Sequence, residues 1–331
     1  MATAIAVAAA LAAAFCFAVG SLIQQQQAVR TEEKVLQARL LLRLARQPRW
    51  LAGVGLSAFS FALQGLALAF GPLALVQPLA ATDVLFALPL IARRNRRRLT
   101  RRDAAGALTI TAGISVFLAV SPPTEGILTP GTLAWAPAVL GVGALTVTAA
   151  LAAERLRGHA RVVWLAAAAG GVYGLLDALA KSSVGLLTRH GIGVLAHWEP
   201  YALIGAGLLG GLFGQSAFGA GPLSLSLPVI DTLEPVAAVV IAATVFGERL
   251  ASSPGQLVLQ LGAGVVAVAG IAVLSHSSVV RTEEERTPAL PGERPGEGAG
   301  GKPGEVAGGR HGEGAGQDPE RRSLARPDET G

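Results

Sequence analysis

Blocks of about twenty apolar residues with few charges inside them follow one another along most of the chain. A helix of about twenty apolar residues crosses a hydrocarbon core about 30 Å thick, and it satisfies its own backbone polar groups there. The blocks lie at 4–23, 51–70, 72–92, 104–120, 132–153, 162–180, 201–220, 222–246 and 256–274. The sequence therefore predicts an all-α, polytopic transmembrane helical bundle of about nine spans.

The distribution of charge agrees with a membrane protein and predicts its orientation. Only 15% of residues are charged, against the quarter usual for soluble domains, and the basic residues gather between the apolar blocks. Lys and Arg fill the loops at 30–49 and 93–102, whereas 71–72 and 121–131 contain none. Because cytoplasmic loops carry the excess of Lys and Arg, we expect the N-terminus outside and the C-terminal tail in the cytoplasm. Basic residues placed this way do not suggest a nucleic-acid partner.

Part of the sequence recurs. The segments 64–78 and 215–228 both contain a Gln followed by Gly-Pro-Leu and then a second Pro. The repeat predicts two four-helix units of opposite orientation, an arrangement that many secondary transporters use for alternating access. The predicted parts are a first transmembrane repeat at 1–130, a connecting transmembrane helix at 131–160, a second repeat at 161–279 and a tail at 280–331. The tail is rich in Gly, Pro, Glu and Arg, which predicts disorder.

Short motifs resemble one transporter superfamily. Leu233-Glu234-Pro235-Val236, followed by the segment 245–250 (VFGERL), resembles the last EamA-type repeat of the drug/metabolite transporter superfamily. The segments 173–181 and 69–82 resemble the NIPA-like magnesium transporter branch of that superfamily. The resemblance covers about 4–275. It implies an integral membrane secondary transporter, and its NIPA-like part implies magnesium as the cargo.

Charged side chains inside the predicted spans are few. A charge at mid-bilayer costs at least about 2.5–3.5 kcal/mol, so each such residue requires a partner, a water-filled cavity or a function. Asp177 and Lys181 are four residues apart and share a helix face. They either neutralise each other near the interface, or Lys181 holds an anionic group of the substrate while Asp177 changes partners during transport. Asp83 lies halfway along the third block.

Two further carboxylates lie in the eighth block. Asp231 and Glu234 are three residues apart, between Pro228 and Pro235, where prolines free backbone carbonyls. This arrangement suits coupling to a cation or a proton, although Asp231 also fits a solvated place near the cytoplasmic surface.

Two uncharged residues, Gln64 and Gln215, recur at matching places in the repeats and either contact the substrate or bond between helices. The predicted substrate-binding residues are Gln64, Asp83, Asp177, Lys181 and Gln215, and the predicted ion-coupling residues are Asp231 and Glu234.

These features together predict a secondary transporter of a small solute. The predicted transporter works by alternating access, and its predicted activity is the export of a metabolite or a drug coupled to protons. The alternatives are a NIPA-like magnesium or divalent cation transporter and a non-transporting membrane scaffold. The sequence contains no nucleophile–base set, HExxH or CxxC, so we expect neither an enzyme nor a cofactor. The expected partners are a small-molecule or ion substrate, the lipid bilayer and, in a homodimer, a second copy of the chain.

Overall fold

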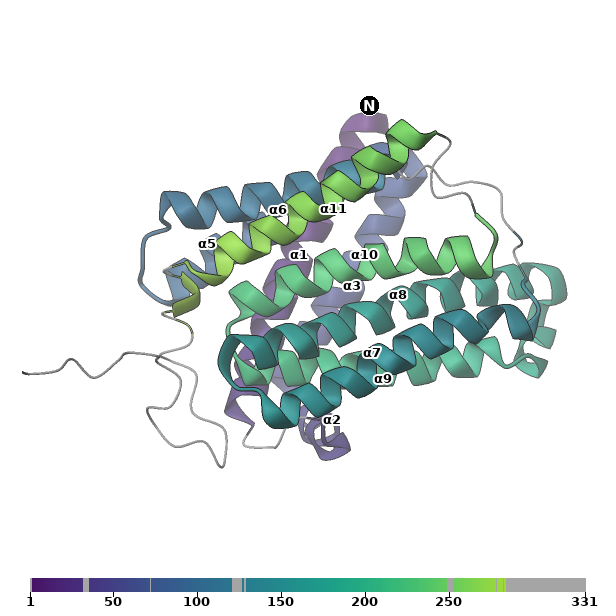
Figure 1. Cartoon of the computed structure of the whole chain (residues 1–331), viewed down its shortest axis with the longest axis horizontal. Helices are drawn as coiled ribbons and strands as arrows, with labels where there is room; N and C mark the ends of the chain where they lie inside the picture. The colour runs from purple at the N-terminus through teal and green to yellow at the C-terminus, as the bar shows by residue number, and fades with distance from the viewer. Residues whose placement is uncertain are drawn as a thin grey trace, which may run out of the picture. The chain divides into compact units, whose positions relative to one another are not determined.

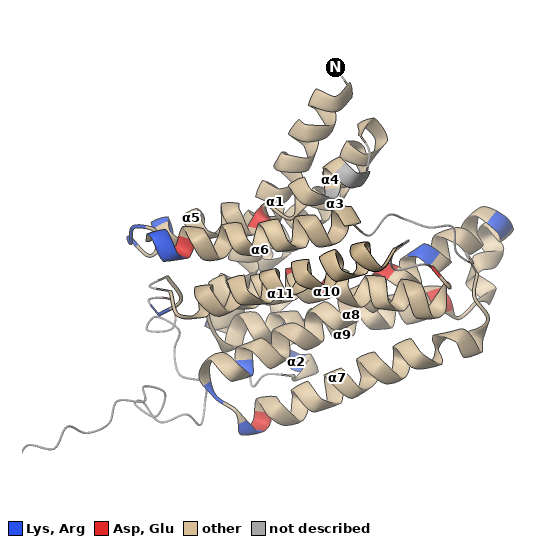
Figure 2. Ribbon diagram, turned by 45° about the horizontal axis from the view of Figure 1, so that its top comes forward, with Lys and Arg blue, Asp and Glu red and all other residues tan. Residues whose placement is uncertain are grey.

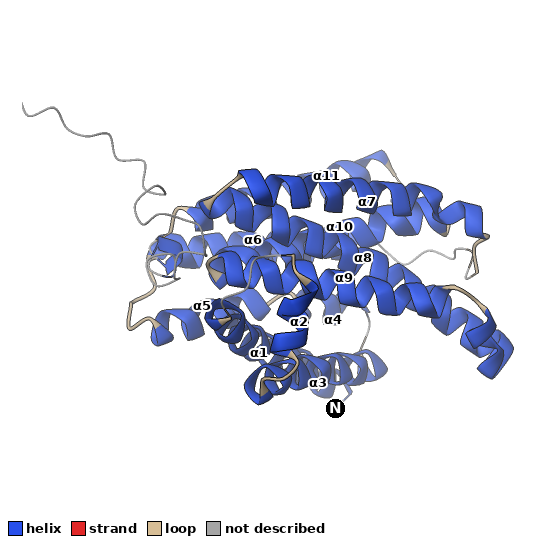
Figure 3. Ribbon diagram, turned by 90° about the horizontal axis from the view of Figure 1, so that it is seen from below, coloured by secondary structure: helices blue, strands red, loops and turns tan. Residues whose placement is uncertain are grey.

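The computed structural model describes residues 2–31, 36–71, 73–120, 127, 129–248, 253–277, 279–281 and 283. Every regular element in these residues is a helix (Figure 3). The elements are α1 (Ala2–Arg30), α2 (Ala38–Leu44), α3 (Pro48–Phe70), α4 (Leu73–Ala80), α5 (Asp83–Arg94), α6 (Arg101–Val120), η1 (Thr132–Trp135), α7 (Ala136–Arg155), α8 (Gly158–His190), η2 (Gly191–Ala196), α9 (Glu199–Ala220), α10 (Leu223–Val245) and α11 (Pro254–Ser275).

Within the described ranges, eight helices are long and apolar enough to cross a membrane. They are α1, α3, α6, η1 with α7, α8 with η2, α9, α10 and α11. Their outer faces carry many exposed Leu, Val and Phe side chains, as expected of helices that face lipid rather than water. The predicted fold class is confirmed, and the chain is a multi-pass membrane protein built as a helical bundle.

The predicted third span at 72–92 is not one continuous helix. In the described part of this segment α4 ends at Ala80 and α5 begins at Asp83. Both the backbone N–H and the hydroxyl of Thr82 bond to the carbonyl of Leu79, at 3.2 and 2.6 Å. This tight turn ends α4, and the Thr82 carbonyl then accepts the first bond of α5 from Leu85, at 2.9 Å. The structure therefore divides this predicted span into two helices, and the count of about nine spans stays a prediction.

The helices pack in pairs (Figure 1). α1 packs along α3, α8 packs along α9, and α6 packs along α11. In the predicted inverted repeat α1 corresponds to α8 and α3 to α9, so the first two contacts are equivalent, and α6 meets its own counterpart α11. These equivalent contacts between α1 and α3 and between α8 and α9 agree with an inverted repeat, but the repeat itself stays a prediction.

Small residues allow the closest of these contacts. A Cβ atom added to Gly113 on α6 would lie 2.6 Å from the backbone nitrogen of Ala267 on α11. One added to Gly270 on α11 would lie 2.8 Å from the nitrogen of Ile110 on α6. The two backbones thus touch through glycines, as small residues allow in membrane helix pairs.

The predicted tail at 280–331 lies outside the described residues, apart from Val280, Arg281 and Glu283. These three are helical, and the Glu283 side chain is buried. The packed part of the chain therefore extends a few residues beyond the predicted boundary.

Candidate functional site

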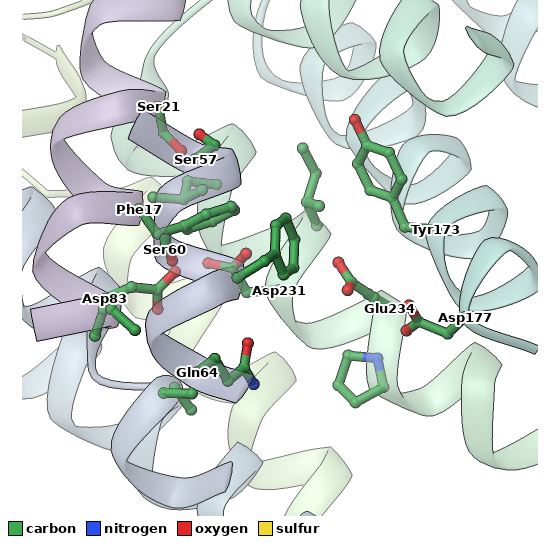
Figure 4. Close-up of a pocket in the computed structure, with 18 of the residues that line it drawn as sticks. Phe17, Ser21, Ser57, Ser60, Gln64, Asp83, Tyr173, Asp177, Asp231 and Glu234 are labelled. Atoms are coloured by element: carbon green, nitrogen blue, oxygen red, sulfur yellow. The ribbon is translucent and has the colours of Figure 1, made fainter. Parts of the chain in front are cut away.

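A cavity of about 850 Å³ lies between helices from both halves of the chain (Figure 4). Side chains of α1 and α3 line one part of it, and side chains of α8, α9 and α10 line another. The break between α4 and α5 adds Ala80, Ala81 and Asp83 to the wall. In membrane proteins a broken helix of this kind is tolerated where it faces protein or a cavity, and such breaks often mark ion and substrate sites.

Four carboxyl groups line this cavity: Asp83 at the start of α5, Asp177 on α8, and Asp231 and Glu234 on α10. Asp83 Oδ1 accepts a hydrogen bond of 2.8 Å from the N–H of Val84. The free N–H groups at the start of a helix favour a negative charge there. Among the described residues no Lys, Arg or His side chain lines the cavity. Its charged groups are therefore all acidic.

The four carboxyl groups form two pairs. Figure 4 shows the carboxyl groups of Asp83 and Asp231 near each other, and a proton on one of two such groups relieves their repulsion away from bulk water. The carboxyl groups of Asp177 on α8 and Glu234 on α10 also lie near each other, on the side of the cavity nearer Tyr173.

A chain of amide and hydroxyl groups, here named the amide chain, joins α1, α3 and α9 at the wall. The Nε1 of Trp50 donates to Gln215 Oε1 at 3.0 Å, and Gln215 Nε2 donates to Gln24 Oε1 at 2.8 Å. Gln24 Nε2 then donates to Ser57 Oγ at 2.9 Å. Three of these residues, Gln24, Ser57 and Gln215, also line the cavity. Gln215 thus bonds between helices, which is one of the two roles considered for it, and it also faces the cavity.

Aromatic rings cover much of the remaining wall, from Phe17, Phe61, Tyr173 and Phe218. Tyr173 fits against α9 because Gly210 leaves room for it, since a Cβ there would lie 2.7 Å from the Tyr173 ring. The cavity therefore offers ring faces beside carboxylates, and both attract cations.

Lys181, predicted to bind substrate, lies elsewhere and does not line the cavity. Its ammonium group pairs with Glu248 beyond the end of α10 and lies 4.9 Å from the ring centre of Phe246. The suggested pair with Asp177 is not the one observed. Glu248 is far from Lys181 along the chain but adjacent in the fold, so helical spacing alone pointed to the wrong partner. The other predicted site residues, Gln64, Asp83, Asp177, Gln215, Asp231 and Glu234, all line the cavity.

A second polar network, here named the Glu283 bridge, was missed by the sequence analysis. Glu283 Oε1 accepts from Arg94 Nη2 at 2.7 Å, and Glu283 Oε2 accepts from the N–H and hydroxyl of Ser224, at 3.0 and 2.5 Å. Arg94 Nη1 also donates to Gln25 Oε1 at 2.9 Å. Burial raises the pKa of the Glu283 carboxyl, while the bonds from Ser224 and the charge of Arg94 oppose this. The bridge ties the residues after α11 to α1, α5 and α10.

Gln24, Ser57 and Tyr173 were also missed as site residues. Hydroxyl and amide groups are common in membrane helices and cost less to bury than a charge, so they give a weak signal. Gln24 belongs to a run of four Gln at 24–27, which was the available hint.

The arrangement of acidic side chains does not form a compact metal site. Over the part of the chain that the structure describes, no group of three or more His, Cys, Asp or Glu residues is placed to hold a metal ion. The carboxyl groups instead surround a space large enough for an organic molecule.

Comparison with known proteins gives one informative relative. No family model matches the chain, and no solved structure matches it. The uncharacterized protein Cgl0250/cg0304 of Corynebacterium glutamicum is 31% identical over 279 residues, which cover 84% of this chain and 96% of the relative. This similarity extends over nearly the whole relative and most of the helical bundle. The chain therefore belongs to the same protein family as Cgl0250/cg0304.

Proposed function

We propose that the protein is a secondary transporter that carries a small organic cation across the membrane in exchange for protons. The observation that carries this proposal is the cavity wall with four carboxyl groups and no described Lys, Arg or His. Buried charges of one sign are strongly unfavourable without a counter-charge. A substrate cation and protons are the two ligands that would neutralise this wall.

The size and lining of the cavity favour an organic cation. Its volume of about 850 Å³ lies within the range of about 300–1,000 Å³ typical of small-molecule sites. The rings of Phe17, Phe61 and Tyr173 supply apolar and π surfaces, which bind quaternary ammonium groups well. The amide chain offers hydrogen bonds to a polar part of the same molecule.

The arrangement of helices also suits alternating access. The cavity lies between the two predicted repeats, and in transporters built from inverted repeats the substrate site lies at such an interface. We place the N-terminus outside and the tail in the cytoplasm, on the basis of the Lys and Arg excess in loops 30–49 and 93–102. Figure 2 shows basic residues where α5 leads toward α6 and where α7 leads into α8, and we assign both connections to the cytoplasm.

A second candidate is magnesium transport. Hard cations prefer carboxylate oxygens, which the cavity provides, and the NIPA-like motifs point the same way. Against it, the described residues hold no group of three acidic or other metal-ligating side chains placed around one point. Magnesium therefore ranks below an organic cation.

Ligand-induced stabilisation of the purified protein separates these candidates. Benzyltrimethylammonium, a permanently charged monovalent cation with one ring, is expected to raise the unfolding temperature in detergent. A ligand at a hundred times its Kd adds about 2.7 kcal/mol to the free energy of unfolding. The uncharged analogue neopentylbenzene, in which a carbon atom replaces the nitrogen, controls for apolar binding and is expected to have little effect. Stabilisation by Mg²⁺ alone, with no response to organic cations, would instead favour the second candidate.

A further inference from the structure

The two carboxyl pairs in the cavity differ in how they are held (Figure 4). The Oδ2 atom of Asp231 is buried and receives no hydrogen bond from an N–H or hydroxyl group of the described residues. Figure 4 shows the Asp231 carboxyl beside the carboxyl of Asp83, where a proton held between them would give both groups a partner. Without that proton, two carboxylates would face each other away from bulk water and repel. This pair is therefore suited to hold one proton.

The Asp83–Asp231 pair also joins corresponding parts of the two predicted repeats. The same distance along the chain separates Pro78 from Pro228 and Thr82 from Thr232. Thr232 bonds backward to the carbonyl of Pro228 at 2.7 Å, much as Thr82 does to Leu79. The turn before α5 and the first part of α10 thus occupy matching places in the two predicted repeats, although α10 is continuous there. Relative movement of the two halves would change the separation of these two carboxyl groups.

Asp177 and Glu234, by contrast, belong to two helices packed tightly together. A Cβ added to Gly174 on α8 would lie 2.7 Å from the carbonyl oxygen of Glu234, and one added to Gly170 would lie 3.1 Å from its nitrogen. Such close backbone contact favours α8 and α10 moving together. We therefore expect this carboxyl pair to stay together if the two halves move relative to each other.

We propose that Asp83 and Asp231 share the proton that is exchanged during transport, whereas Asp177 and Glu234 hold the substrate cation. This assignment rests on the proposed function. One monovalent cation enters as one proton leaves, so the net charge of the cavity is unchanged. The bound cation compensates the second negative charge that appears on the Asp83–Asp231 pair, and loss of the shared hydrogen bond frees α5 from α10. Sequence analysis had grouped Asp231 with Glu234, whereas we assign them to different pairs.

The surroundings of the proton-sharing pair are otherwise uncharged. The remaining titratable groups on the cavity wall are Glu234 on α10 and Asp177 and Tyr173 on α8. The other elements around the cavity, α1, α3, α4, α6 and α9, contribute only uncharged described side chains to its wall. The pair thus responds chiefly to charge at the Asp177–Glu234 site.

Proton release on cation binding tests this division. The full-length protein, in weakly buffered detergent with a pH-sensitive dye, is titrated with benzyltrimethylammonium. The wild type is expected to release about one proton per bound cation and to bind more tightly as the pH rises. Asp83→Asn and Asp231→Asn each leave one carboxyl and an amide that can donate to it. These variants should still bind the cation, but without proton release and with an affinity that no longer changes with pH. Glu234→Gln should lose binding, and Glu154→Gln, on the exposed end of α7, should behave like the wild type.

Two outcomes overturn the assignment while leaving cation transport standing. One is proton release that persists in both Asp83→Asn and Asp231→Asn. The other is loss of binding in these two variants together with retained binding in Glu234→Gln. A wild-type protein that binds no organic cation overturns the proposed function itself. Unfolding temperatures without ligand identify a variant that fails to fold, and Asp83 and Asp231 provide independent tests because either substitution removes the proton-sharing pair.

Discussion

Replacing Glu234 with Gln, or Asp177 with Asn, is expected to weaken the binding of benzyltrimethylammonium by at least about thirtyfold, the effect of losing one partner of a buried charge pair. Both carboxylates line the cavity, and no described basic residue on its wall already satisfies them. The amide substitutes keep the size of the side chain and remove only the charge. The loss should therefore appear in affinity for the cation, with little change in the unfolding temperature of the unliganded protein.

Isothermal titration calorimetry on the purified variants measures this effect. Glu154→Gln removes an exposed carboxylate at the end of α7 and controls for a general change in charge. If the affinity for the cation in both Asp177→Asn and Glu234→Gln equals that of the wild type within experimental error, Asp177 and Glu234 do not bind the cation.

Replacing Arg94 with Ala is expected to lower the free energy of unfolding by about 3 kcal/mol, at the lower end of the range for breaking a buried ion pair. Arg94 is partly exposed, with 27% of its side chain accessible, whereas only 1% of the Glu283 side chain is accessible. Removing the arginine takes the guanidinium charge away from the buried Glu283 carboxylate, so this substitution should cost more than Glu283→Ala. The Glu283 bridge would then be a fold-stabilising contact that the chain makes just after α11.

A double-mutant cycle measures the Arg94–Glu283 interaction. Unfolding in mild detergent is followed for Arg94→Ala, Glu283→Ala and the double variant, with Arg93→Ala, an exposed neighbour on α5, as the matched control. The double variant should be more stable than the sum of the single losses predicts, because both single variants lose the same interaction. Strictly additive effects would contradict a direct interaction.

The fold class and the carboxyl groups on the cavity wall could be predicted from the sequence for one physical reason. Hydrocarbon penalises both exposed backbone groups and lone charges, so long apolar blocks had to be helices and the few acids inside them had to face a cavity or a partner. Asp83, Asp177 and Glu234 were found in this way. Gln215 was found because its place in the sequence repeats that of Gln64.

The features that escaped prediction depend on contacts between distant segments. The pairing of Lys181 with Glu248, and of Arg94 with Glu283, joins residues that no helical spacing relates. The break at Thr82 was missed because a twenty-residue apolar block looks the same whether or not a hydroxyl turn divides it. Tyr173 is placed by the absence of side chains at Gly210 and Gly214, and sequence alone does not show which partner a glycine accommodates.

Transport driven by a proton gradient tests the central claim most directly. Wild-type protein in liposomes with an acidic lumen should take up radiolabelled benzyltrimethylammonium from a neutral medium, and nigericin with potassium on both sides should abolish the uptake by collapsing the pH difference. Glu234→Gln, reconstituted at the same density, should take up no more than protein-free liposomes. Wild-type uptake that equals that of protein-free liposomes, or that is unaffected by loss of the pH gradient, would contradict proton-coupled cation transport.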